Sequence, residues 1–255
     1  SGNQFGMDSE NLKRAVAEKG SYEGVDIVAI HYYSGTQKKK LAVVEKELAE
    51  LEKLADTLEE RFGLSGISLE YGPGLPADYF GDDPEGRDMA VLAEAGAMIA
   101  AVAARRSVTV EFGRFLASPC GTYLTAAADI KNNNGENFVI CDGGINHLKY
   151  YGQTMAMQTP PITLLGDHGE KTEDYTLCGS LCTTADILVR KVTLPALSVG
   201  DVLAFGRCGA YSVTEGIGLF LSRQLPRIVL HSERGGNRLL RDFYGTDILN
   251  SPAEV

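Results

Sequence analysis

Hydrophobic positions in the first 115 residues switch repeatedly between helical and strand-like spacing. Apolar residues recur every three or four positions over 41–62, with lysines and glutamates between them, and Gly63 follows. This pattern predicts an amphipathic helix that ends at Gly63. Further helices are predicted over 8–19, where Asp8 can act as the N-cap, and over 87–105.

Three short apolar runs alternate with these helices, at 25–31, 67–71 and 107–111. Runs of this length and composition are typical of strands buried in a parallel sheet. Their alternation with helices predicts parallel strands joined by crossover helices. A (β/α)8 barrel needs eight strands, and an open sheet of three leaves its edges exposed. We therefore expect a second chain, or residues upstream of Ser1, to complete the sheet.

The second half of the chain has a different pattern, with short β-type runs, frequent turn residues and little helical periodicity. The sequence Asn132–Asn133–Asn134–Gly135 is a hairpin signal between two such runs. Strands are predicted at 123–130, 137–141, 202–205, 217–221 and 228–231. The predicted fold class is α/β plus β, with a partial barrel over 1–115 followed by a mainly antiparallel β domain over 116–255.

Composition and charge exclude several classes of protein. The chain has 255 residues, of which 44% are hydrophobic and 23% charged, as in soluble globular proteins. A net charge of −10 argues against nucleic-acid binding, and no apolar run approaches the roughly 20 residues that span a membrane. No signal peptide is evident at the N-terminus. Five scattered cysteines are typical of a reducing compartment, so a cytoplasmic location is expected.

A metal site is not expected from the cysteines. Cys178 and Cys182 lie four positions apart, but His168 is the one histidine near them and the chain has no second cysteine pair. A structural zinc site needs four convergent ligands.

Candidate chemistry is concentrated in loops that follow predicted strands, where the active sites of α/β proteins are built. These loops lie at 31–37, 72–76 and 111–114, and two more at 179–186 and 209–211 lie in the β domain. Each is weak evidence alone. A histidine at a strand end is more often structural than catalytic, Gly-Pro-Gly is usually a turn, and a lone cysteine is mostly a core residue. Their order and spacing together carry more weight.

In this order the segments resemble those of the fold-type III pyridoxal-phosphate (PLP) decarboxylases, which include diaminopimelate, ornithine, arginine and carboxynorspermidine decarboxylases. Seven partial motifs match in sequence, at 5–6, 31–35, 72–74, 111–114, 142–144, 179–182 and 209–211. The resemblance covers nearly the whole chain. It implies that 1–115 is the C-terminal half of a PLP-binding (β/α)8 barrel of the alanine racemase-like (TIM-barrel) type. Residues 116–255 would be the C-terminal β domain.

The resemblance also implies roles for individual residues. Glu111 would face the pyridine nitrogen of PLP and keep it protonated, and His31 would stack on the ring. Cys182 would return a proton to the substrate carbon, reaching the site across the interface of a homodimer. The other cofactor-binding residues implied are Ser34, Gly72, Gly74, Gly113, Arg114 and Tyr211, and all of these except Gly113 are assigned to the phosphate.

The sequence departs from the family pattern at positions that bear on the substrate. Thr183 stands where an acidic residue usually binds the distal amine of the substrate, and threonine cannot pair with an ammonium group. A plain basic amino acid is therefore not expected. Asn146–His147 resembles the branch that acts on amino acids tethered to carrier proteins, so the substrate is expected to be a small amino acid or such a tethered one. Pro73 also removes one N–H donor from the phosphate loop.

The lysine that forms a Schiff base with PLP has no counterpart in this sequence. In the family it lies upstream of Phe5, and the lysines here, among them Lys38, are expected to be solvated surface residues. The chain is thus expected to be the C-terminal portion of a decarboxylase and to be inactive alone. A catalytically inactive homologue with a binding or regulatory role is the alternative, and a relative of alanine racemase is a third. Retention of His31, Glu111 and Cys182 favours the enzyme.

Overall fold

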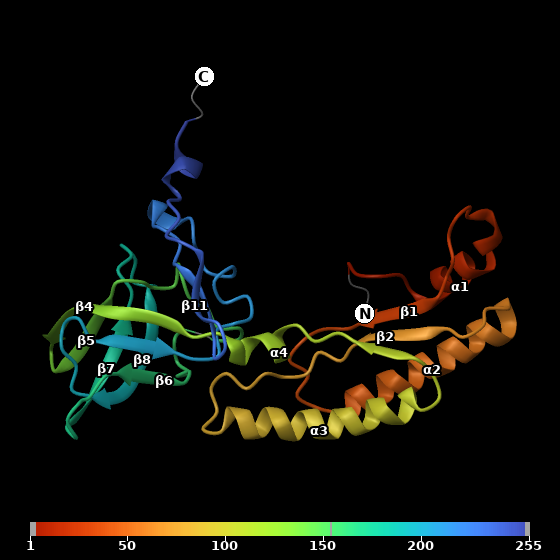
Figure 1. Cartoon of the computed structure of the whole chain (residues 1–255), viewed down its shortest axis with the longest axis horizontal. Helices are drawn as coiled ribbons and strands as arrows, with labels where there is room; N and C mark the ends of the chain where they lie inside the picture. Colours follow the sequence, from red (N-terminus) through yellow and green to blue (C-terminus); the bar gives the residue numbers. More distant parts are fainter. Residues whose placement is uncertain (1–3, 154, 253–255) are drawn as a thin grey trace. The chain divides into compact units, whose positions relative to one another are not determined.

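The computed structural model describes residues 4–153 and 155–252 (Figure 1). The chain divides into two compact units. The first contains the residues up to Asp78 together with Asp83–Phe115. The second contains Tyr79–Asp82 and the residues from Leu116 onward.

The first unit is built on a parallel sheet with the strand order β1-β2-β3. Two long helices, α2 and α3, form the crossovers, and a short helix precedes β1. The elements are α1 (Ser9–Ala17), η1 (Lys19–Ser21), β1 (Ala29–Tyr33), α2 (Ala42–Phe62), β2 (Ser68–Gly72), α3 (Pro84–Ala103) and β3 (Val108–Val110). Two short helical turns follow, α4 (Arg114–Ala117) and η2 (Ser118–Cys120).

Both crossover helices begin or end for identifiable reasons. Gly63 ends α2 with a left-handed φ of 65°, a conformation that glycine adopts without steric cost. This confirms the predicted end of the helix. At the start of α3, the side chain of Asp83 accepts a hydrogen bond from the amide of Gly86, which satisfies one of the free N–H groups of the first turn.

The two faces of the parallel sheet have different environments. Ile30, Leu69 and Tyr71 are buried in one core with the apolar stripe of α2, and α2 and α3 lie on this one side of the sheet (Figure 1). Because side chains alternate along a strand, His31 and Glu70 project to the opposite face. That face carries the polar positions of the sheet.

The second unit is a six-stranded sheet with the order β6-β9-β4-β5-β7-β8. Its strands are β4 (Tyr123–Asn133), β5 (Glu136–Cys141), β6 (Ile162–Leu165), β7 (Thr172–Cys178), β8 (Ile187–Pro195) and β9 (Val202–Phe205). The pair β5–β7 is parallel and the other pairs are antiparallel. At the predicted hairpin, Asn134 and Gly135 both have positive φ, as a tight turn between β4 and β5 requires.

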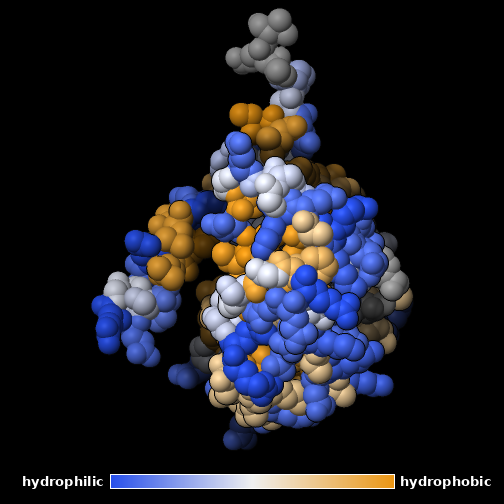
Figure 2. Space-filling model, turned by 90° about the vertical axis from the view of Figure 1, so that its right-hand side faces the viewer, coloured by the Kyte–Doolittle hydropathy of each residue, from blue (hydrophilic) through white to orange (hydrophobic). Residues whose placement is uncertain are grey.

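The C-terminal part of the second unit forms a separate two-stranded ribbon of β10 (Ile228–Ser232) and β11 (Gly236–Arg241), flanked by η3 (Phe220–Ser222) and η4 (Asp247–Asn250). Among the described residues, no helix is long and apolar enough to cross a membrane. Hydrophilic side chains prevail on the face of the molecule drawn in Figure 2, with smaller hydrophobic areas between them.

Two sequence-based expectations differ from the structure, and several strands were missed. The strand predicted to start at position 25 starts at Ala29, and Val25 and Val28 are exposed rather than buried. The strand predicted over 217–221 is wrong, because Leu221 and Ser222 have left-handed φ angles that a strand cannot contain. The strands β6, β7, β8 and β11 were not predicted.

Candidate active site

His31 and Glu111 meet on the face of the parallel sheet that the helices leave open. Nε2 of His31 lies 2.9 Å from Oε2 of Glu111, and the two side chains are 56% and 48% exposed. His31 belongs to β1, whereas Glu111 directly follows β3, so the hydrogen bond crosses over β2. The amide of Glu111 donates to the carbonyl of Tyr71 and continues the ladder by one residue. The sheet therefore fixes both backbones while the two side chains stay accessible to a ligand.

This pair offers a flat imidazole and an anionic acceptor side by side. A carboxylate has about four lone-pair positions on its two oxygens, so Glu111 can accept from His31 and still accept a second hydrogen bond. The second donor can be the N–H group of a heteroaromatic ring, because a carboxylate forms a strong hydrogen bond with such a donor.

The loops that follow β1 and β2 approach each other closely, with backbone against backbone at Gly74 and with the Gln37 side chain bonded to the backbone of Ala77. Gly74 has a φ of +61°, and a Cβ atom there would lie 1.9 Å from the carbonyl oxygen of Gly35. The amide of Lys38 donates to the carbonyl of Gly74 over 3.0 Å. At Gly72, a Cβ atom would lie 2.9 Å from Cδ2 of Tyr33. At Gly74 two stretches of backbone come together at the strand ends, the arrangement by which main-chain amides hold a phosphate, so this loop fits the phosphate of PLP.

Ser34 has a different partner from the one that the resemblance implies. Its hydroxyl donates to Oε1 of the buried Glu47 in α2. A serine hydroxyl carries a single proton, so Ser34 can donate to a phosphate only if this bond breaks.

Lys38 is not a solvated surface lysine, and that expectation is wrong. Its side chain is 10% exposed, and its ammonium group lies 2.8 Å from Oε2 of Glu47. The residue lies in the loop before α2 rather than on a polar helix face, and the buried carboxylate holds the charge inside. The available signal was the position of Glu47, which lies three residues after Val44 and four before Leu51 and therefore on the apolar face of α2.

The last two predicted residues of this unit lie at the start of α4. Gly113 is an exposed bend, and Arg114 is the first residue of the helix, with 8% of its surface exposed. A buried guanidinium is a fixed positive charge, as the predicted role beside a phosphate requires.

Cys182, Thr183 and Tyr211 belong to the second unit. Cys182 is exposed, and Thr183 is partly exposed, with its Oγ1 accepting from the amide of Ala185 at 3.3 Å. Tyr211 is 52% exposed and has a φ of +63°.

Asp186 organises the loop that carries Cys182, a role that was not predicted. The side chain is 3% exposed and accepts from the amides of Leu181, at 2.8 Å, and Ile145, at 2.9 Å. A Cβ atom at Gly144 or Gly179 would lie 2.3 or 2.2 Å from its carboxylate oxygens. The available signal was an acidic residue between a glycine-containing loop and an apolar run, which is typical of a side chain that binds loop amides.

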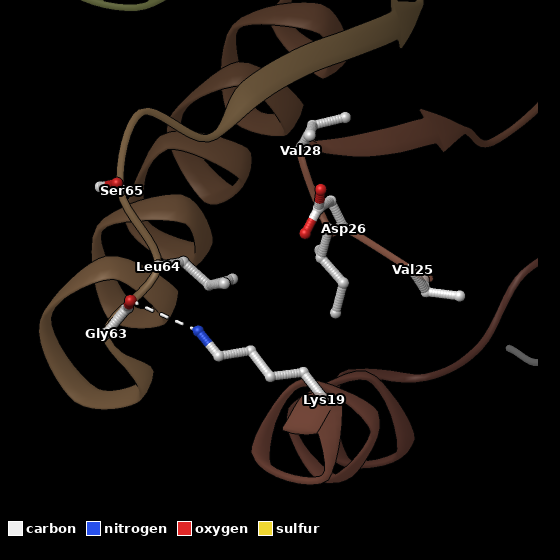
Figure 3. Close-up of a pocket in the computed structure, with 8 residues that line it drawn as sticks. Lys19, Val25, Asp26, Val28, Gly63, Leu64 and Ser65 are labelled. Atoms are coloured by element: carbon white, nitrogen blue, oxygen red, sulfur yellow. Dashed lines mark hydrogen bonds between the residues drawn. The ribbon is translucent and has the colours of Figure 1, made fainter. Parts of the chain in front are cut away.

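No other candidate site was found among the described residues. In residues 4–153 and 155–252, no group of three or more histidine, cysteine, aspartate or glutamate side chains could hold a metal ion. A shallow pocket of about 450 Å³ lies before the amino ends of β1 and β2, where Lys19 donates to the carbonyl of Gly63 (Figure 3). None of the predicted site residues lines it.

Comparisons with known proteins identify the family of the chain. Residues 41–209 match the family model described as pyridoxal-dependent decarboxylase, C-terminal sheet domain. The chain is 28% identical over 249 residues to the L-glutamyl-[BtrI acyl-carrier protein] decarboxylase of Niallia circulans, covering 93% of this chain and 58% of that protein. It is 28% identical over 211 residues to the diaminopimelate decarboxylase of Archaeoglobus fulgidus, covering 82% of this chain and 50% of that one.

Solved structures give the same fold. The crystal structure of diaminopimelate decarboxylase from M. jannaschii matches 99% of this chain and 58% of that one, with a TM-score of 0.81 and 25% identity. The chain thus spans between half and three-fifths of the length of these relatives. The predicted fold, a partial barrel with a β domain, is confirmed. Because the family model matches more than half of the chain, we conclude that the chain belongs to the pyridoxal-dependent decarboxylases and carries their C-terminal sheet domain.

Proposed function

We propose that this chain is the C-terminal portion of an enzyme that decarboxylates an amino acid or an amino-acid derivative with PLP. The observation that carries the proposal is the His31–Glu111 pair on the open sheet face, beside the bare backbone of Gly72–Gly74. Family membership supports the same chemistry. No observation favours the alternative of an inactive homologue with a regulatory role.

Each residue has a distinct task in this proposal. PLP supplies the electron sink that loss of carbon dioxide requires. Glu111 holds a proton on the pyridine nitrogen through its free acceptor position, and His31 packs its imidazole plane against the ring. The Gly72–Gly74 backbone holds the phosphate, and Arg114 and the adjacent Gly113 contribute charge and close approach.

The substrate proposed is an amino acid attached to a carrier protein. Thr183 carries no charge and so cannot neutralise a distal ammonium group. One relative, at 28% identity, is named as a decarboxylase of an L-glutamyl group on an acyl-carrier protein, whereas others are named as diaminopimelate decarboxylases. The threonine favours the first of these two substrate classes.

The remaining roles are proposed from the resemblance. We propose that Cys182 returns the proton to the substrate carbon and that the Tyr211 hydroxyl donates a hydrogen bond to the phosphate. Both would act in a homodimer. The exposed thiol and the exposed tyrosine side chain are compatible with contact to a ligand or to a second copy.

We also infer that this 255-residue chain alone does not form the covalent bond to PLP. The side chain of Lys38, beside the proposed site, lies 2.8 Å from the Glu47 carboxylate, and its nitrogen would have to leave this partner to attack an aldehyde. Borohydride reduction with PLP, followed by mass spectrometry, is expected to show no pyridoxyl-lysine at Lys38. A modified Lys38 would contradict this inference.

Decarboxylation is tested with Glu111→Ala in the enzyme that contains this chain together with the Schiff-base lysine. We expect PLP-dependent release of carbon dioxide from a carrier-bound amino acid, and a rate lowered by about a hundredfold or more in the variant, as for other groups that stabilise developing charge. Glu94→Ala, an exposed position on α3, is the control and should retain the wild-type rate. The proposal fails if no amino acid, free or carrier-bound, releases carbon dioxide, or if the Glu111 variant is as fast as the control.

A further inference from the structure

One buried carboxylate in the first unit is not used by the proposed chemistry. Glu47 is 6% exposed in α2, where the neighbouring buried residues are apolar. Glutamate is seldom buried unless hydrogen-bonded and paired, because its charge loses hydration. Here three donors converge on it: the Ser34 hydroxyl, the Tyr71 hydroxyl at 2.6 Å and the Lys38 ammonium at 2.8 Å.

The three donors come from the two segments that would surround the phosphate, here called the phosphate cup: the loop after β1 (residues 34–38) and the end of β2 with the start of the loop that follows it (residues 71–74). Ser34 and Lys38 lie in the loop after β1, and Tyr71 is the residue before Gly72 in β2. The backbone links the same loops, since the amide of Lys38 donates to the carbonyl of Gly74. Glu47 therefore connects, from beneath, the two segments that must keep a fixed spacing for a phosphate to fit between them.

The charges within this cluster are balanced. A carboxylate near a phosphate would repel it, and the repulsion is strong where water is excluded. The Lys38 ammonium is in contact with the Glu47 carboxylate and lies 5.9 Å from the centre of the Tyr71 ring, so the cluster has no net charge. Burial and the bond to Glu47 raise the pKa of the Tyr71 hydroxyl well above its usual range, so it remains a donor. The cluster can thus position the loops without opposing an anion.

We propose that Glu47, together with Lys38 and Tyr71, is a positioning residue of the phosphate site, which locks the two loops together before a phosphate binds. The inference rests on the proposed function for the identity of the ligand. The locking itself is a property of the chain without any ligand.

The test uses two variants with opposite electrostatic effects. Glu47→Gln leaves the Lys38 cation without its carboxylate, and Lys38→Met leaves the Glu47 anion without its cation. If net charge alone governed binding, the first variant would bind PLP more tightly and the second more weakly. If the hydrogen bonds of Glu47 govern binding by holding the two loops together, both variants should lower the affinity for PLP by about tenfold, as expected for loss of one charge-assisted hydrogen bond.

A phosphate-free probe separates positioning from general damage. The affinity for pyridoxal, measured by fluorescence titration beside PLP, should change by less than about twofold in both variants, since pyridoxal makes no contact with the cup. Tyr71→Phe keeps the ring in the core and removes one donor, so it provides a variant that folds and should weaken PLP binding by about threefold. Glu60→Gln, an exposed residue of α2, is the control and should match the wild type.

Hydrogen exchange of the Lys38 amide in the unliganded chain gives a readout independent of PLP. In Glu47→Gln the exchange rate should rise by about tenfold, because the amide's bond to Gly74 depends on the lock. Unchanged exchange, a tighter complex of Glu47→Gln with PLP, or equal losses for PLP and pyridoxal would each overturn the inference. If the enzyme that contains this chain together with the Schiff-base lysine binds no PLP at all, the proposed function fails, and the exchange rate alone decides whether Glu47 holds the two loops together.

Discussion

At the scale of single residues, glycine has two separable uses in the first unit. Gly63 and Gly74 both have left-handed φ angles, +65° and +61°. Around Gly63 nothing lies within 4 Å of the position where a Cβ atom would stand, whereas at Gly74 the carbonyl oxygen of Gly35 is 1.9 Å from that position. The first glycine is required for its backbone conformation alone, and the second also for the crossing of two loops.

This difference predicts unequal effects of the same substitution. Gly63→Ala should lower the free energy of unfolding by about 1 kcal/mol, the usual cost of a left-handed alanine. Gly74→Ala should lower it by about 3 kcal/mol, because the loops must also move apart. Urea denaturation of both variants, followed by circular dichroism, measures the difference. Equal urea midpoints for the two variants would show that the loops around Gly74 can move apart without loss of stability.

At the scale of elements, His147 connects β4 with the segment that precedes the C-terminal ribbon. Its Nδ1 lies 3.0 Å from the Tyr123 hydroxyl, and its Nε2 lies 2.7 Å from the carbonyl oxygen of Gln224. A carbonyl accepts, so Nε2 carries the proton and Nδ1 accepts from Tyr123. This tautomer is neutral, and burial lowers the pKa of the imidazole below its ordinary value.

The lowered pKa gives the stability of the second unit a definite pH dependence. Below the ordinary histidine pKa of about 6.5 the unfolded chain binds a proton that the folded chain does not, so stability falls as the pH drops from about 7. His147→Phe cannot titrate and should show a shallower decline between about pH 7 and pH 5.5. Urea midpoints of the wild type and the variant across this range measure the effect. Parallel declines would mean that His147 does not contribute to the acid sensitivity.

Elements with regular periodicity were predictable from the sequence, and conformations set by tertiary contacts were not. The spacing over α2 and the stop at Gly63 rest on local chemistry, and both are confirmed. The segment 217–221 is as apolar as a buried strand, but its backbone adopts a left-handed conformation at Leu221 and so does not form one. Within the site, the motifs located His31 and Glu111, which do meet. They could not identify Glu47, because its role depends on three partners distant in sequence.

At the scale of the whole chain, the division into units does not follow one cut in the sequence. A boundary near residue 115 was predicted, yet Tyr79–Asp82, which lies between β2 and α3, groups with the second unit. Tyr79 is 2% exposed, and its ring centre lies 5.7 Å from that of Tyr150. Phe80 also contacts the Tyr150 ring, at 5.9 Å, and the Tyr150 hydroxyl donates to the carbonyl of Gly206.

A substitution in this short insertion should therefore destabilise strands far away in the sequence. Tyr79→Ala should lower the stability of the second unit by about 3 kcal/mol, as for other large aromatic side chains removed from a core. Tyr79→Phe, which keeps the ring, should lower it by about 1 kcal/mol or less. Hydrogen exchange resolves the location of the change: amides of β4 and β9 should exchange faster, while those of α2 and β2 keep their wild-type rates. Faster exchange confined to α2 and β2 would instead show that Tyr79 stabilises the first unit. In that case the fragment 116–255 should be as stable as the same residues in the full chain.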